Sequence, residues 1–409
     1  MLKKVLVSLT ILSVSALLLA LGATFIHGQF YLNQQQWQVD RLAIQEHVEV
    51  ALTEREYGLF SSKLTYRITL DADQDSPVTF VLINQASYFP HQIRILSQLA
   101  VPSIWAEQFE SPVMPMQLLS HMDVMGNFHG EFTMDSWLVE DGVAGLVQVQ
   151  PALGTVAGNL EAFDLNFNWD GFAANGMLGE MKLQGLRIAA ELRAIAPELY
   201  VGDSEWSIGG LDSSDSNNQF SLRDFKVSNV MTENGSNLSH GISLGWESIT
   251  TQLGAAQYHS AQSLMKLNIS GIDKTSWLAL QTLAQDEQAT ESEVEAQLLA
   301  MLQNGMAVDV PELKLNLQDA NASGELQFSL ARNDLNELAQ VQSLLAKVNG
   351  KANLAVDYRL VQMLPMPIEQ VNQMVAVGYL TFDENSEQYR ADLSVTEGQL
   401  TLNGQPLPM

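Results

Sequence analysis

Leu64-Thr65-Tyr66-Arg67-Ile68-Thr69-Leu70 is the stretch from which the fold of this chain can be read. Its apolar side chains occupy every second position, and polar or charged side chains lie between them. Successive side chains of a β-strand point to opposite faces of a sheet, so this pattern predicts a strand with one buried and one solvated face. Strands of this kind are typical of antiparallel sheets that cover a core on one side.

The residues before this stretch complete a β-hairpin. Val48, Val50 and Leu52 alternate with polar side chains in the same way, which predicts a second strand. Tyr57-Gly58-Leu59-Phe60-Ser61-Ser62 lies between the two runs and supplies a glycine, the residue that most readily adopts the positive φ of a tight turn. We therefore expect a hairpin over residues 46–70.

Alternation of this kind recurs through most of the chain. Further runs lie at 79–83, 181–188, 220–227, 264–269, 313–317, 326–330, 352–360 and 389–395. Gly and Asn cluster between the runs, and the sequence lacks the regular succession of strands and helices that a parallel sheet requires. The predicted fold class is α+β, predominantly antiparallel β: an extended curved sheet with a few C-terminal helices, preceded by one transmembrane helix.

Helical patterns occur late in the chain. Residues 276–304 carry apolar side chains at helical spacing near their end, and Gly305 is a stop signal. Residues 334–345 open on a sequence that resembles a capping box and continue with apolar residues on one helix face. Pro367 begins a third predicted helix, which ends at Gly378.

The chain closes with a second predicted hairpin. Residues 389–395 form one strand, Glu397-Gly398 forms the turn, and Leu400 and Leu402 belong to the returning strand. We divide the part that follows residue 45 into a β-rich region, 46–270, and an α+β region, 271–409.

Composition excludes several classes of function. The chain has 409 residues, 20 Lys+Arg and 47 Asp+Glu, which gives a formal net charge of −27. Binding to the nucleic-acid backbone needs a surplus of cations, so this balance argues against it. The chain contains no cysteine, which excludes disulfides, thiolate metal sites and a cysteine nucleophile.

The N-terminal residues predict an uncleaved membrane anchor. Residues 5–26 carry no charge and are long enough to cross a hydrocarbon core of ~30 Å as a helix. Lys3 and Lys4 precede this segment and no cation follows until Arg41, which orients residues 1–4 to the cytoplasm. A cleaved signal peptide is the alternative, although the apolar run is longer than such peptides use. We expect residues 27–45 to be a tether and the rest to be periplasmic, at a bacterial inner membrane.

Two short segments resemble the YdgA-like family of bacterial envelope proteins of unknown function. The residues that carry the resemblance are Tyr57, Gly58, Phe60, Ser61 and Ser62 near the start and Gly398, Asn403 and Gly404 near the end. In that family an Arg usually lies between the Tyr and the Gly, and this chain lacks it. The resemblance implies a single-span protein with a large periplasmic part and no assigned catalytic residues. The ending also resembles AsmA-like envelope proteins, which are linked to outer-membrane assembly and lipid movement, a fold-level analogy only.

One motif raises the possibility of hydrolysis. Gly241-Ile242-Ser243-Leu244-Gly245 matches the Gly-x-Ser-x-Gly pattern that places a nucleophilic serine on a turn between a strand and a helix. Only His259 follows Ser243, and Glu247 is the sole acid between them. The alternative interpretation is a Gly-rich β-turn between two strands.

Two groups of residues resemble metal sites in their residue types and spacing. Asp71, Asp73 and Asp75 fit the first positions of an EF-hand loop, but the Gly and Glu that the loop requires later are missing. His121 and Asp123 share one face of a predicted strand, and a turn at Gly126-Asn127 would bring His129 alongside them. We predict neither a metal nor any other cofactor.

The methionines offer a candidate apolar surface. Met114, Met116, Met122 and Met125 lie close together in the sequence, and methionine suits both irregular cores and adaptable binding surfaces. The predicted function is that of a non-catalytic, membrane-anchored periplasmic protein that handles lipid or an apolar client segment on a curved sheet. The alternatives are a scaffold for another envelope protein and, as a third hypothesis, a serine hydrolase that uses Ser243.

Overall fold

A computed structural model gives the structure of the chain. It describes residues 48–57, 61–70, 78–89, 92–123, 125–142, 144–159, 161–177, 179–196, 199–284, 289–334, 346–363, 368–396 and 398–407. The chain divides into two compact units. Unit 1 comprises residues 1–194 and 206–218, and unit 2 comprises residues 195–205 and 219–409. The division falls near residues 195–218, so β14 and β15 lie in the same unit as the helices that follow them.

Unit 1 is built from antiparallel strands. Its elements are β1 (Val48–Tyr57), β2 (Ser61–Leu70), β3 (Val78–Phe89), β4 (Gln92–Ala100), the 3-10 helix η1 (Ser103–Gln108), β5 (Val113–Asp123), β6 (Phe128–Met134), β7 (Trp137–Asp141), β8 (Gly145–Val149), β9 (Ala152–Gly158), β10 (Ala162–Gly176) and β11 (Gly179–Ala196). Strands β1 to β6 pair in sequence order, β6 pairs with β9, and β9 pairs with β10. The last two residues of β11 belong to unit 2, and β12 (Leu199–Ser214) and β13 (Asn218–Asn234) also contribute residues to both units.

The alternating stretch of β2 directs one face into the core of unit 1. Leu64, Tyr66 and Ile68 are at most 2% exposed, whereas Arg67 is exposed. Tyr66 lies opposite Leu82 and Ile68 lies opposite Phe80 in β3, and all of them belong to one cluster of buried residues. The predicted strand and its hairpin with β1 are therefore confirmed.

Strand β10 changes partners at a glycine. Residues 163–169 of β10 pair with β9, and residues 172–175 pair with β8. Gly171 lies between the two segments with φ +112°, a backbone conformation that side chains other than glycine rarely adopt. This glycine allows one strand to join two partners on the same edge.

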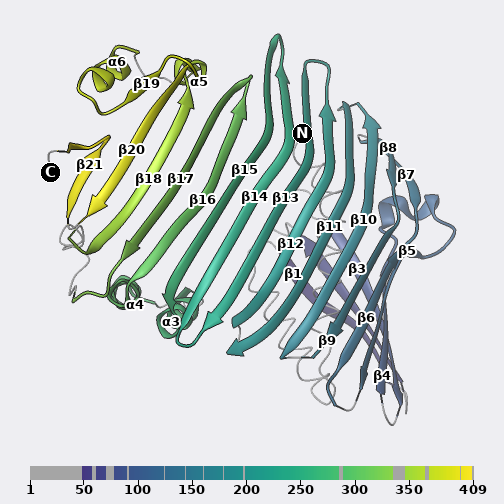
Figure 1. Ribbon diagram of the computed structural model, residues 1–409. Helices are drawn as coiled ribbons and strands as arrows, with labels where there is room; N and C mark the ends of the chain where they lie inside the picture. The colour runs from purple at the N-terminus through teal and green to yellow at the C-terminus, as the bar shows by residue number, and fades with distance from the viewer. Residues whose placement is uncertain are drawn as a thin grey trace. The chain divides into compact units, whose positions relative to one another are not determined.

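Unit 2 forms a second antiparallel series (Figure 1). Its elements are β14 (Asn237–Leu253), β15 (Ala256–Asp273), α3 (Lys274–Ala284), α4 (Glu291–Asn304), β16 (Met306–Leu317), β17 (Ala320–Leu330), β18 (Val348–Asp357), α5 (Tyr358–Met363), α6 (Ile368–Ala376), β19 (Thr381–Asp383), β20 (Gln388–Thr396), β21 (Gln399–Leu402) and β22 (Gln405–Pro406). The pairing order is β14–β15–β16–β17–β18–β20, with β19 and β21 both on the outer side of β20.

The helices agree in part with the sequence pattern. Residues 276–304 predict one helical region, and the structure contains two helices there, α3 and α4. The side chain of Thr290 and that of Glu293 form a capping box at the start of α4, and Gly305 ends it with φ 79°. Helix α6 and the C-terminal hairpin of β20 and β21 are confirmed. The predicted helix within 334–345 lies outside the described residues beyond Asp334.

None of the helices formed by the described residues has the length and apolarity needed to cross a membrane. The predicted anchor, residues 5–26, lies outside the described part of the chain, and so do Gly58, Phe60 and the acidic turn 71–77. Tyr57 ends β1, while Ser61 and Ser62 begin β2, so the first motif flanks the turn of the predicted hairpin.

Asn403 fills a gap in the outer edge of β20. Its side-chain Oδ1 accepts a hydrogen bond from the backbone N–H of Asp392 at 2.8 Å, and its Nδ2 donates to the carbonyl oxygen of Tyr379 at 3.0 Å. Asn403 has φ 48°, and Asn tolerates this left-handed conformation better than most residues. Gly404 (φ 77°) and Gly398 (φ 80°) occupy the turns on either side of β21. The second motif therefore shapes the end of the sheet.

We expect Asn403→Ala to lower the free energy of unfolding of unit 2 by about 2 kcal/mol, because it leaves polar backbone groups unpaired and places alanine at positive φ. Urea denaturation followed by circular dichroism measures the change. Gln399→Ala, at an exposed position of the neighbouring strand β21, is the control and should change stability by less than about 0.5 kcal/mol. Equal effects of both substitutions would contradict the assigned role of Asn403.

Candidate functional site

One face of the unit 2 sheet is apolar from β14 to β21. Side chains that lie directly opposite each other in antiparallel strands point to the same side of the sheet, so the strand register identifies each face. One row of partners is His240, Ile269, Val308, Phe328, Gly350, Val395 and Leu400. A second row is Leu244, Met265, Leu313, Gly324, Leu354 and Ala391. Between them lie Ile242, Leu267, Val310, Leu326, Ala352, Leu393 and Leu402. We call these three rows the apolar face.

The opposite face of the same strands is polar. Its rows contain Gly241, Asn268, Asp309, Gln327, Lys351, Ser394 and Thr401, then Ser243, Lys266 and Glu312, and also Glu325, Asn353 and Asp392. Lys266 and Lys314 both bind the carboxylate of Glu312, at 2.7 Å and 2.6 Å. The hydrogen bond from Lys266, followed by that from Lys314, lowers the pKa of Glu312 to about 2. The charged and polar side chains of this face make it suited to contact with water.

Much of the apolar face remains in contact with solvent. Met265, in the middle of β15, is 37% exposed, and Leu354 on β18 is 43% exposed. Most of the remaining apolar side chains on this face are half-buried, and Val395 is buried. A sheet face packed against a second layer would bury such residues almost completely. A contiguous apolar surface of this extent is typical of a binding site.

Two pairs of helices cover the ends of the apolar face. At one end, Trp277 and Leu278 of α3 and Met301 of α4 pack with Leu238 and Ile269 of the sheet. At the other end, residues of α5 and α6 pack with Val356 and Tyr389. Figure 1 shows α3 and α4 at one end of the strands of unit 2 and α5 and α6 at the other. The two pairs lie over different strands: α3 and α4 contact β15, whereas α5 contacts β17 and β18.

Few polar atoms interrupt the apolar face. The three rows contain no charged residue, and His240 is their only member with a polar side chain. Trp246 of β14 points to the same side, and its Nε1 donates to the hydroxyl of Ser260 at 3.1 Å. The arrangement can hold an apolar molecule by burying its surface, but it offers almost no donor or acceptor that would recognise a polar group.

Neither His259 nor Glu247 is placed to act with Ser243. Ser243 lies inside the long strand β14 on the polar face, which corrects both the strand-to-helix turn and the β-turn expected from its flanking glycines. His259 pairs with Thr250, on the opposite face and about 23 Å further along β14 at ~3.3 Å per residue. Glu247 instead interacts with Asp224, whose hydrogen bond and negative charge raise the pKa of Glu247. Gly241 and Gly245 are tolerated inside β14 because this strand pairs with β15 along most of its length.

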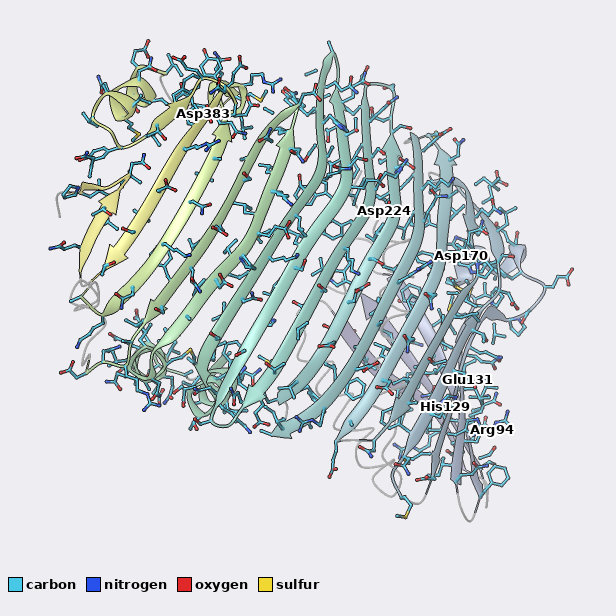
Figure 2. The ribbon with its side chains drawn as sticks, viewed as in Figure 1. Arg94, His129, Glu131, Asp170, Asp224 and Asp383 are labelled. Atoms are coloured by element: carbon cyan, nitrogen blue, oxygen red, sulfur yellow. The ribbon has the colours of Figure 1, made fainter. Side chains whose placement is uncertain are left out.

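The histidines of unit 1 meet as the sequence predicts. His121 in β5 lies opposite His129 in β6, and Arg94 in β4 lies opposite His121. Burial, followed by the positive charge of Arg94, lowers the pKa of His121. His129 Nε2 contacts Glu131 Oε1 at 3.0 Å. Figure 2 labels Arg94, His129 and Glu131 in this part of unit 1.

Asp123 does not join these histidines. Its Oδ1 accepts backbone hydrogen bonds from Met125 and Asn127 at 2.8 Å and 2.9 Å, and the side-chain hydrogen bond from Asn127 is the largest cause of its lowered pKa. Asp123 therefore stabilises the turn between β5 and β6. Within the part of the chain that the structure describes, no three His, Asp or Glu side chains are placed to hold a metal ion.

The four methionines do not form one exposed surface. Met114, Met116 and Met122 are 2%, 3% and 5% exposed and lie in the core, whereas Met125 is 82% exposed in the turn after β5. The reason is the alternation of β5, which turns all the even-numbered positions from 114 to 122 inward. Met114 and Met116 also line a hollow of about 550 Å³ on unit 1 with Phe109 and Trp137.

The sequence alone does not identify the apolar face as a site. The runs at 313–317, 326–330, 352–360 and 389–395 each predict a half-buried strand, and they lie in β16, β17, β18 and β20 of unit 2. The third prediction is wrong at its end, because residues 358–360 belong to helix α5. All four runs show alternating apolar and polar residues. Only the strand register shows that their apolar side chains point to the same face of the sheet.

Comparisons with known proteins place the chain in a family but not in a functional class. No curated protein and no solved structure matches the chain. A family model described as "Bacterial protein of unknown function (DUF945)" matches residues 2–409, which is nearly the whole chain. The protein is therefore a member of the DUF945 family of bacterial proteins of unknown function.

Proposed function

We propose that this protein is a non-catalytic, membrane-anchored periplasmic protein of the bacterial cell envelope that holds an apolar ligand on the apolar face of unit 2. The observation that carries the proposal is that apolar side chains from neighbouring strands form continuous rows on this face. Met265 and Leu354 in these rows are exposed to solvent. Burial of apolar surface yields about 25 cal/mol per Å², so a water-exposed face of this size favours any apolar molecule that can cover it.

The anchor supports the same role. Residues 5–26 would hold the body beside a bilayer, where apolar molecules are abundant, while Lys3 and Lys4 keep the first residues in the cytoplasm. The net charge of −27 disfavours adsorption of the body to an anionic membrane surface. The anchor, and not surface electrostatics, would therefore set the distance between the apolar face and its ligand.

Site-specific photocrosslinking in cells tests the ligand. The full-length chain carries benzoylphenylalanine in place of Met265, on the apolar face, or in place of Ser270, an exposed residue of the same strand on the polar face. We expect irradiation to yield adducts of lipid mass at position 265 and none at position 270. Equal labelling at both positions, or no adduct at position 265, would refute the proposed ligand site. A discrete protein adduct at position 265 would favour the scaffold role.

A further inference from the structure

We propose that the outer edge of β7 in unit 1 binds an extended segment of another polypeptide as an added strand, and that this segment carries alternating apolar and basic side chains. The proposal concerns a different unit from the apolar face and does not depend on the ligand proposed for that face. Three features carry it: an unpaired strand edge, a hollow beside that edge, and a long stretch of sequence without a cation.

Strand β7 has unpaired main-chain groups at its outer edge. Among the described residues, β7 pairs with β8 alone. At the other edge the side chain of Gln108 in η1 binds both main-chain groups of Glu140. Its Nε2 donates to the carbonyl oxygen at 2.8 Å, and its Oε1 accepts from the N–H at 2.6 Å. Residues two apart in a strand direct their N–H and C=O to the same edge, so those of Leu138 also point outward. No hydrogen bond to another described residue occupies them.

An unpaired strand edge is a template for an incoming strand, and proteins usually protect such edges. Gln108 protects one residue of this edge, because it supplies the two hydrogen bonds that a neighbouring strand would supply there. Leu138 is not protected in this way, and it is 53% exposed. Peptides that add to a sheet edge gain affinity from main-chain hydrogen bonds and specificity from pockets for their alternate side chains.

A hollow of about 550 Å³ lies beside this edge. Leu138 lines it together with Trp137, Phe109, Met114 and Met116. The indole N–H of Trp137 is buried and has no hydrogen-bond partner among the described residues. A buried donor without an acceptor is rare and costs free energy, and a carbonyl group of a bound main chain would supply the acceptor. The hollow is therefore suited to an apolar side chain of a strand added next to Leu138.

The charge around the hollow favours a basic segment. Residues 95–181, which include all of β5 to β10, contain eleven Asp and Glu and no Lys or Arg. Two of these acids, Glu110 and Asp135, line the hollow itself. Complementary charge steers a partner to such a surface, and like charges placed opposite each other in paired strands are unfavourable. A second copy of this chain would bring the same acidic stretch to the edge, which disfavours it as the partner.

Peptide binding to the full-length protein, held in a non-ionic amphipathic polymer, tests the proposal. The probe is a dye-labelled peptide of about eight residues in which Leu and Lys alternate, and fluorescence anisotropy measures its affinity at about 0.15 M salt. We expect it to bind at least about 30-fold more tightly than the peptide in which Glu replaces Lys. A Leu-Lys peptide with methylated backbone nitrogens keeps the charge and the side chains but cannot donate to a strand edge. It should bind about tenfold more weakly than the unmethylated peptide.

Two substitutions at one position isolate the strand edge. Leu138→Pro removes the outward-pointing N–H, and edge strands tolerate proline where the N–H does not pair within the sheet. Leu138→Ala shortens the side chain but keeps the N–H. We expect Leu138→Pro to weaken binding of the Leu-Lys peptide about tenfold and Leu138→Ala less than about threefold. Neither substitution changes the charge of the protein, so the difference between them reports on main-chain pairing.

A substitution in unit 2 separates this site from the apolar face. Met265→Lys would weaken a Leu-Lys peptide held on that face, through charge repulsion and desolvation of the new ammonium group, but should leave binding at β7 unchanged. A loss of about tenfold in Met265→Lys would therefore overturn the assignment to β7.

The remaining outcomes are equally decisive. Absence of binding by the Leu-Lys peptide, or equal binding of its Glu counterpart, would overturn the basic segment. Equal binding of the methylated peptide, or equal losses in the two Leu138 variants, would overturn the addition of a strand. The peptide series uses the unmodified protein, so it decides the question even if Leu138→Pro fails to fold, which circular dichroism would reveal.

Discussion

Gly171→Ala is expected to lower the free energy of unfolding of unit 1 by about 4 kcal/mol, through backbone strain and overpacking together. The methyl group would lie 1.9 Å from the carbonyl oxygen of Leu183, on the neighbouring strand β11, and that oxygen belongs to backbone that cannot move alone. The φ of +112° at this position is also unfavourable for alanine. Gly171 lies where β10 exchanges β9 for β8, so relaxation at this point disturbs two strand pairs.

Urea denaturation followed by tryptophan fluorescence measures this effect. Trp169 is buried two residues before Gly171, and its Nε1 donates to the carbonyl oxygen of Gln150 at 3.0 Å, so its emission reports on the same region. Gly142→Ala is the matched control, because an added Cβ there has no neighbour within 4 Å. The control should change stability by less than about 0.5 kcal/mol. A loss below about 1 kcal/mol in Gly171→Ala would contradict the close approach of β10 and β11.

The strands of this protein could be predicted from its sequence much further than their arrangement. Leu64, Tyr66 and Ile68 alternate with polar residues, and the structure buries all three. The role of Gly171 could not be predicted, because nothing in the residues around it distinguishes a pivot between two partners from a glycine in a turn. Gly241 shows the reverse error: its pattern suggests a turn, but the pairing of β14 with β15 keeps it inside a strand.

The candidate site depends on register, which a single sequence does not specify. A shift of one residue between strands moves every side chain to the other face. Val308, Phe328 and Val395 each belong to a strand with an alternating pattern, but only their pairing through Ile269 and Gly350 shows that they share one face. The methionine cluster illustrates why composition alone misleads: Met114 and Met116 are soft apolar residues of the kind that line binding sites, yet the pleat of β5 places both in the core.

A negative charge on the apolar face should have the largest effect on ligand binding. We expect Met265→Glu to weaken binding of a brominated fatty alcohol, measured by the quenching of tryptophan fluorescence, by about 30-fold or more, because a bound chain would remove the new carboxylate from water. Met265 is 37% exposed in the middle of β15, so the carboxylate is solvated in the unliganded protein and the substitution should cost little stability.

Ser270→Glu is the matched control for this substitution. Ser270 is exposed on the same strand, and its side chain faces the polar side between Ser239 and Ala307. Ser270→Glu adds the same charge to a chain that already carries −27, so long-range repulsion changes equally in the two variants. An uncharged ligand experiences no long-range repulsion from the added carboxylate. Any difference in binding between the two variants therefore comes from the face of the sheet on which the carboxylate lies. If Ser270→Glu weakened binding as much as Met265→Glu, the ligand would not lie on the apolar face. A large loss confined to Met265→Glu would assign binding to that face, since desolvation of a charge acts only where the hydrocarbon makes contact.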